Sequence, residues 1–255
     1  MPPPYHNPHW QVFTRTPHVP AGAVGYIPSD WVTNHRLHGI PTGAIPLPTQ
    51  QLDRTQVRDI CQNLANPVLF GYICVMAWGL QGAGPGGQRH VASSWGSNAV
   101  IAAHLNILRS GGLTRSQAYQ QFLGAGNIPG LGPSYWTKLL YFFSLSPLFF
   151  IMDQWTGKSI NLLTNNSVVR MAGNAPSNLN NVGNYQAYCE EVDAIATHLG
   201  VTGEQAEEML MSKGGHHPWQ WRHHVRNNWP PSRPVHRYNA VSMHTQYPHI
   251  PLAHF

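Results

Sequence analysis

The stretch that determines the fold is NIPGLGPSYWTKLLYFFSLSPLFFIMDQWTGKSI, residues 127–160. Its first part, IPGLG at 128–132, reads as a tight turn, because Gly130 and Gly132 are free to adopt backbone angles closed to other residues. The proline that follows suits the first turn of a helix, and residues 134–144 contain almost no helix breaker. The pattern predicts a hairpin between two helices.

A hairpin of this kind presents free backbone N–H groups and a helix N-terminus at one place, which suits a phosphate oxygen. Such contacts hold DNA without reading its sequence. We therefore expect DNA contacts around Ile128, Gly130, Gly132 and Ser134. Helix-hairpin-helix elements also occur as plain DNA-binding units in polymerases, helicases and repair nucleases, so the hairpin alone does not indicate an enzyme.

The second part of the stretch leads to an aspartate. Ser146 and Pro147 end the helix, and the apolar run 148–152 returns through the core to Asp153. A carboxylate that directly follows five apolar residues is not expected to be merely solvated. An aspartate before a helix is most often an N-cap, and a helix is predicted over residues 154–163.

Together, the hairpin, the helix and the aspartate resemble the helix-hairpin-helix DNA glycosylase superfamily. The longer pattern, LGPSYWTKLLYF followed by IMDQWTGKSI, is most similar to a bacterial group of 8-oxoguanine glycosylase-fold proteins. The match covers residues 55–212 in outline and is sharp over 128–160. It implies an all-α, two-lobed bundle and a base excision repair enzyme that removes an oxidised purine, 8-oxoguanine, from double-stranded DNA. It also leads us to expect a monomer in the bacterial cytoplasm, associated with the nucleoid.

The resemblance also assigns roles to residues. Asp153 occupies the position of the catalytic aspartate. In members that also cleave the strand, a lysine just after the hairpin attacks the sugar C1′ and forms a Schiff base, but Ser134 stands at that position here. Lys138 lies on the same helix face, about 6 Å further along the axis.

Three interpretations remain open. Lys138 is a displaced nucleophile, which we favour because SYWTKLLYF looks like that bacterial group's own signature. Alternatively, Ser134 marks an enzyme in which Asp153 supports attack by water and no strand cleavage follows. The third interpretation, from another class, is a non-catalytic helix-hairpin-helix protein that binds DNA.

The chemistry explains why these residue types are needed. Breaking the N-glycosidic bond develops positive charge on the sugar, which a buried carboxylate stabilises. An amine nucleophile must be neutral, so its pKa has to be lowered by desolvation or by a neighbouring cation. The target base must also leave the stack and enter a pocket. The glycine-rich segment 79–87 is predicted to be a flexible active-site loop, with Trp78, Gln81 and Arg89 as candidates for the base pocket, although Trp78 suits the core better.

Composition sets limits on the remaining possibilities. The 255 residues carry 15 Lys and Arg against 10 Asp and Glu, a formal charge of +5 that favours nucleic acid as partner. Three distant cysteines, Cys61, Cys74 and Cys189, predict neither a disulfide framework nor a metal site, and they cannot supply a four-cysteine iron–sulfur cluster. We expect no cofactor, no metal and no membrane span.

Pro- and His-rich segments flank the predicted helical domain. Residues 1–50 are interpreted as an irregular extension that packs partly through Trp31, and residues 51–212 as the glycosylase-like domain. The tail, 213–255, is expected to be disordered. Further helices are predicted at 54–64, 68–79, 98–109, 115–123, 185–199 and up to residue 211, with Asp53, Asn66, Thr114 and Thr202 as N-caps.

Overall fold

The computed structural model describes residues 5, 7–20, 22–39, 46–80, 84–126, 128–212 and 219–229. These residues are mostly helical, and their only regular strands are the two-residue β1 (Met171–Ala172) and β2 (Ala175–Pro176), which pair antiparallel. The all-α prediction is therefore confirmed. None of the described helices combines the length and the apolar character that crossing a membrane requires.

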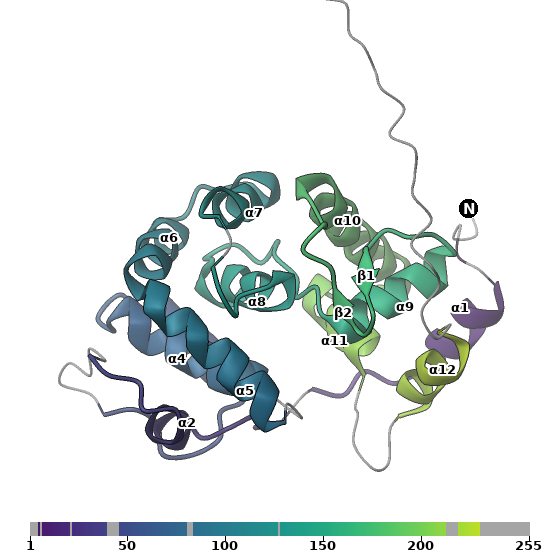
Figure 1. Ribbon diagram of the computed structural model, residues 1–255. Coiled ribbons are helices and arrows are strands. Elements are labelled where there is room, and N and C mark those ends of the chain that lie inside the picture. The colour runs from purple at the N-terminus through teal and green to yellow at the C-terminus, as the bar shows by residue number, and fades with distance from the viewer. Residues whose placement is uncertain are drawn as a thin grey trace, which may run out of the picture.

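The helices form two lobes that lie side by side (Figure 1). The first lobe contains α2 (Pro28–Asn34), α3 (Arg54–Gln62), α4 (Val68–Gly79), α5 (Pro85–Ala92), the 3-10 helix η1 (Ser93–Ser97), α6 (Asn98–Ser110), α7 (Arg115–Gly124) and α8 (Pro133–Phe143). The second contains α1 (Asn7–Phe13), α9 (Gln154–Thr164), the β1–β2 pair, α10 (Val182–Leu199), α11 (Gly203–Met211) and α12 (Gln220–Asn228). The chain therefore crosses between the lobes twice, from α1 to α2 and from α8 to α9.

Local sequence signals account for most helix starts. The predicted N-caps are confirmed, each with a complete capping box, at Asp53, Thr114 and Thr202. Asn66 is the exception, because α4 begins at Val68 with Pro67 in the N-cap position, while the Asn66 side chain donates to the Ile60 carbonyl. As its apolar composition predicts, α4 is central, and its residues from Phe70 to Trp78 are buried.

Both ends of the chain contain helices where irregular or disordered structure was predicted. Trp31 is 1% exposed in α2, as expected, but α1 and α12 also pack on the second lobe. Phe13 and Trp221 are fully buried there, with ring centroids 5.0 Å apart. Pro- and His-rich composition misled the prediction because a few large aromatic anchors are enough to hold helices of two turns.

Part of the glycine-rich segment 79–87 is helical, although a flexible loop was predicted there. Pro85 opens α5 at its first position, so residues 85–87 form the first helical turn rather than a flexible loop. Residues 81–83, including Gln81, lie outside the described residues.

The hairpin between α7 and α8 requires only one of its two glycines. Gly130 has φ +77°, and a Cβ there would lie 2.0 Å from the His90 carbonyl oxygen and 2.7 Å from Ser93 Oγ. Gly132 has φ −91° and ψ −179°, an extended conformation open to any residue. Of the two glycines, only Gly130 uses a backbone angle closed to other residues, and it lets the hairpin approach the end of α5.

This difference predicts the response to substitution. We expect Gly130→Ala to lower the free energy of unfolding by about 2–4 kcal/mol, because it combines a strained φ with a backbone clash. Gly132→Ala is the matched control, since its Cβ would meet only Asn178 Oδ1 at 3.3 Å. Urea unfolding of both variants measures the effect, and equal losses would contradict this account of the hairpin.

Candidate active site

In the hairpin, backbone N–H groups rather than the side chain of Ile128 are available for a DNA contact. Ile128 is 3% exposed and Gly130 is buried, so both shape the turn from inside. Leu131 N–H donates to the Ile128 carbonyl at 3.1 Å. Among the described residues, the N–H groups of Gly132 and Ser134 have no acceptor, as a phosphate contact at the start of α8 requires.

Lys138 is buried on α8, with 5% of its surface exposed. Its Nζ donates to the Ser134 carbonyl at 3.1 Å and lies 5.4 Å from the centre of the Tyr135 ring. Gly79 provides the space for its aliphatic stem, because a Cβ on Gly79 would lie 2.8 Å from Lys138 Cδ. Burial lowers the pKa of Lys138, and Arg54 lowers it further, against the opposite effects of two carboxylates. The fold thus favours the neutral amine that nucleophilic attack needs.

Asp153 caps α9 and is 8% exposed. Its Oδ1 accepts from the backbone N–H groups of Trp155 at 2.7 Å and Thr156 at 3.1 Å. Oδ2 has no hydrogen-bond partner among the described residues, yet it is not among the atoms sealed from solvent. One oxygen therefore orients the carboxylate, while the other is free to face a developing positive charge.

Thr137 connects the helix that carries Lys138 to the strand-like run that ends in Asp153. Its Oγ1 accepts from Met152 N–H at 3.0 Å and donates to the Pro133 carbonyl at 2.9 Å. Tyr188 donates to the Ile151 carbonyl at 2.6 Å from the other side. These contacts set the spacing between the hairpin and the aspartate. Thr137 and Tyr188 were not predicted as site residues, because neither belongs to a recognisable sequence motif.

Lys138 and Asp153 are close enough to interact electrostatically but form no direct ion pair. The helix after the hairpin therefore carries a sequestered amine, and the next helix begins with a fixed carboxylate. Such a pair is suited to attack at a carbon that becomes cationic as its leaving group departs. Ser134, half-buried, lies one turn before the amine and holds it through its carbonyl.

Comparison with protein families agrees with this geometry. A family model described as "Putative 8-oxoguanine DNA glycosylase OGG-like protein" matches residues 17–211. The chain belongs to this OGG-like family. The resemblance read from the hairpin and Asp153 is thereby confirmed, and damaged DNA is the substrate class that the family name implies. No curated protein and no solved structure shows significant similarity to the chain.

Two of the candidates for a base pocket lie in different surroundings in this OGG-like chain. Trp78 is 3% exposed, and its ring lies edge-on to Phe142 at 5.0 Å, which is the position of a core residue. Arg89 is exposed on α5, the helix whose end contacts the hairpin. Gln81 lies outside the described residues, so its part in a base pocket stays a prediction.

A buried ionic cluster joins the two lobes beside the lysine. Arg54 of α3 forms an ion pair with Glu207 of α11 and lies 3.5 Å from both Glu204 and Glu208. Its guanidinium stacks 4.1 Å from the centre of the Tyr141 ring, on α8. The cluster was not predicted from the sequence because its charged members come from two distant helices, α3 and α11, and the charges of each resemble a solvated face.

The cluster predicts an unusual pH dependence of stability. Burial raises the pKa of Glu207 to about 7, from 4.5 for a free carboxyl, despite the attraction of Arg54. Between these pH values the native state binds more protons than the unfolded state, so the free energy of unfolding falls as pH rises through this window. A glutamine at 207 does not titrate. Ionisation of Glu207 therefore lowers the free energy of unfolding of wild type, and not of the Glu207→Gln variant, by on the order of 1–3 kcal/mol.

We therefore expect Glu207→Gln to become more stable relative to wild type as pH rises. Urea unfolding at about pH 5 and about pH 8 measures this difference. Glu204→Gln is the control, because Glu204 is 37% exposed and lies on the same helix. Parallel pH profiles of wild type and Glu207→Gln would contradict the assignment.

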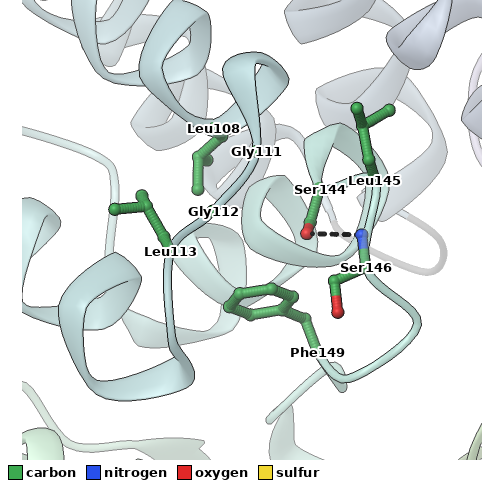
Figure 2. Close-up of a pocket in the computed structure, with 8 residues that line it drawn as sticks. All are labelled: Leu108, Gly111, Gly112, Leu113, Ser144, Leu145, Ser146 and Phe149. Carbon is green, nitrogen blue, oxygen red and sulfur yellow. Dashed lines mark hydrogen bonds between the residues drawn. The ribbon is translucent and has the colours of Figure 1, made fainter.

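A separate cavity of about 320 Å³ lies beyond the other end of α8 (Figure 2). It is lined by Leu108, Gly111, Gly112, Leu113, Ser144, Leu145, Ser146 and Phe149. None of these residues belongs to the hairpin or to the Lys138 and Asp153 site, so we assign the cavity no part in the chemistry. Among the described residues, no three or more His, Cys, Asp or Glu side chains are grouped as metal ligands.

Proposed function

We propose that this protein excises an oxidised purine, 8-oxoguanine, from double-stranded DNA, with Asp153 and Lys138 as catalytic residues. The observation that supports this most directly is the buried Lys138 amine, whose pKa is lowered by burial, on the helix that follows the hairpin and near the N-cap carboxylate of α9. A surface lysine on a structural DNA-binding unit has no need of this environment. Membership of the OGG-like family supports the same substrate class.

In the proposed reaction, the hairpin backbone holds a phosphate while the damaged base leaves the stack. The N-glycosidic bond breaks, its electron pair leaves with the purine, and the purine takes up a proton. Asp153 Oδ2 stabilises the positive charge that develops on the sugar. The lone pair of neutral Lys138 Nζ forms the new bond to C1′, and opening of the sugar ring gives a Schiff base that permits strand cleavage.

Borohydride trapping tests this proposal. Wild-type protein is incubated with duplex DNA that contains 8-oxoguanine, and free base and covalent adduct are both measured. Release with an adduct is the expected result, since borohydride reduces the Schiff base to a stable amine. Release without an adduct would support the alternative in which Ser134 marks an enzyme that uses water. Binding without release on 8-oxoguanine and other oxidised purines would leave a non-catalytic DNA-binding protein.

A further inference from the structure

Three cations gather around one aromatic ring next to the start of α9. Lys158 of α9 places Nζ 5.0 Å from the centre of the Trp155 ring. Arg222 and Arg226 of α12 place their guanidinium carbons 3.9 Å and 5.6 Å from the same centre. We call Lys158, Arg222 and Arg226 the cation cluster; Trp155 directly follows the first residue of α9, two positions after Asp153.

The cluster has no acidic partner of its own. Among the described residues, none of its three members forms an ion pair, whereas buried Arg54 lies among three carboxylates. Burial and the neighbouring Arg222 lower the pKa of Lys158, and Asp153 is the carboxylate that acts on it in the opposite direction. The fold therefore keeps three like charges together without a direct ion pair among the described residues, and Asp153 is the carboxylate whose charge acts on both Lys158 and Arg222.

Arg222 and Lys158 of the cluster form hydrogen bonds with neighbouring segments, whereas Arg226 forms none with the described residues. Arg222 Nε and Nη2 donate to the carbonyls of Met211 and Ser212, at the end of α11, and Lys158 donates to Asn174 Oδ1 at 2.9 Å. Arg222 Nη1 has no partner among the described residues and is not sealed from solvent. Arg226 is exposed and likewise donates to no described residue. Donors thus remain available on the side that faces solvent.

α12 is fixed against α9 rather than loosely attached. Trp221 is fully buried and donates through Nε1 to Ser159 Oγ at 2.9 Å, and Val225 is 1% exposed. Figure 1 shows α12 beside α9 and α1 in the second lobe. The helix lies beyond the residues 17–211 that match the family, so the two arginines on the Trp155 ring come from outside the matched region.

We infer that Lys158, Arg222 and Arg226 form a binding site for a backbone phosphate of the DNA strand that enters the active site. The inference rests on the proposed function. A phosphate has enough oxygens to accept from an ammonium and two guanidinium groups at once. It would also cancel the positive field that the bare cluster exerts on the sugar, where a cation must develop beside Asp153. The cluster thereby couples strand binding to the chemistry.

The salt dependence of DNA binding tests this site. Arg226→Ala removes an exposed cation, and Lys158→Gln removes a charge while keeping an N–H for Asn174 Oδ1. The control is Arg36→Asn, which removes an exposed arginine from the end of α2 in the other lobe and tolerates its φ of +50°. Fluorescence anisotropy gives the affinity for labelled duplexes, undamaged or with an abasic-site analogue, at several salt concentrations, and thermal unfolding verifies that each variant folds.

We expect each cluster variant to weaken binding to both duplexes by a similar factor. The slope of log K against log salt concentration should fall by about 0.9 for each lost contact and by about 1.8 in the double variant. Arg36→Asn should keep the wild-type slope. Folded variants with an unchanged slope, in a wild type that binds DNA and releases base, would overturn this inference alone. A wild type that does not bind duplex DNA would overturn the proposed function together with it.

Discussion

Asp153→Asn is expected to fold normally and to release base about 100- to 1000-fold more slowly than wild type, the usual effect of removing one preorganised electrostatic group. Asparagine is as good an N-cap as aspartate. Its Oδ1 can still accept from Trp155 N–H and Thr156 N–H, so α9 should begin as before. What disappears is the negative charge at Oδ2, which has no other partner among the described residues.

A matched control separates charge from capping. Asp53 is also an N-cap with a complete capping box, at the start of α3. Asp53→Asn should therefore retain full activity. Single-turnover release of 8-oxoguanine from a duplex, with unfolding midpoints for both variants, makes the comparison. Unchanged release by a folded Asp153→Asn protein would remove this carboxylate from the proposed mechanism.

Lys138→Gln is expected to lose the borohydride-trapped adduct completely, because glutamine has no amine to form a Schiff base. The chain has only three lysines, Lys138, Lys158 and Lys213, so peptide mapping of the wild-type adduct identifies the nucleophile without ambiguity. Lys213→Gln is the control and should trap DNA as wild type does. An adduct on Lys158 would contradict the assignment, since that lysine is also buried and near Asp153.

The pH dependence of trapping gives a second test of the same residue. Burial lowers the pKa of Lys138 below its ordinary value of 10.5, and the neutral fraction of an amine rises with pH and levels off above its pKa. The trapping rate of wild type should therefore reach its plateau at a lower pH than the rate of an exposed lysine would. A rate that continues to rise towards pH 10.5 would mean that the amine is not sequestered during the reaction.

Several features follow from the sequence because they depend on neighbours along the chain. A glycine such as Gly130 in IPGLG, a capping box such as that of Thr114, and an all-apolar run such as that of α4 each act over a few residues. The order of hairpin, helix and aspartate is also a local pattern. For this reason most helices between residues 54 and 211, the hairpin and the family could be predicted from the sequence.

Other features depend on contacts between distant segments. Burial of Lys138 requires Gly79 of α4, and the ionic cluster at Glu207 requires Arg54, more than 150 residues away along the chain. α1 and α12 were expected to be irregular, yet they pack together because Phe13 and Trp221 bury their rings in one place. Periodicity and composition contain no information about which remote surface a side chain will meet.

The sequence by itself therefore determined an all-α fold, the helix-hairpin-helix element and Asp153 at the start of a helix, since each is written in short-range signals. Only the tertiary structure decided that Lys138 is desolvated and that Arg222 interacts electrostatically with both Asp153 and Arg226. The physical reason is that pKa values and electrostatic fields depend on the distances between charges and on exclusion of water, both of which packing alone establishes.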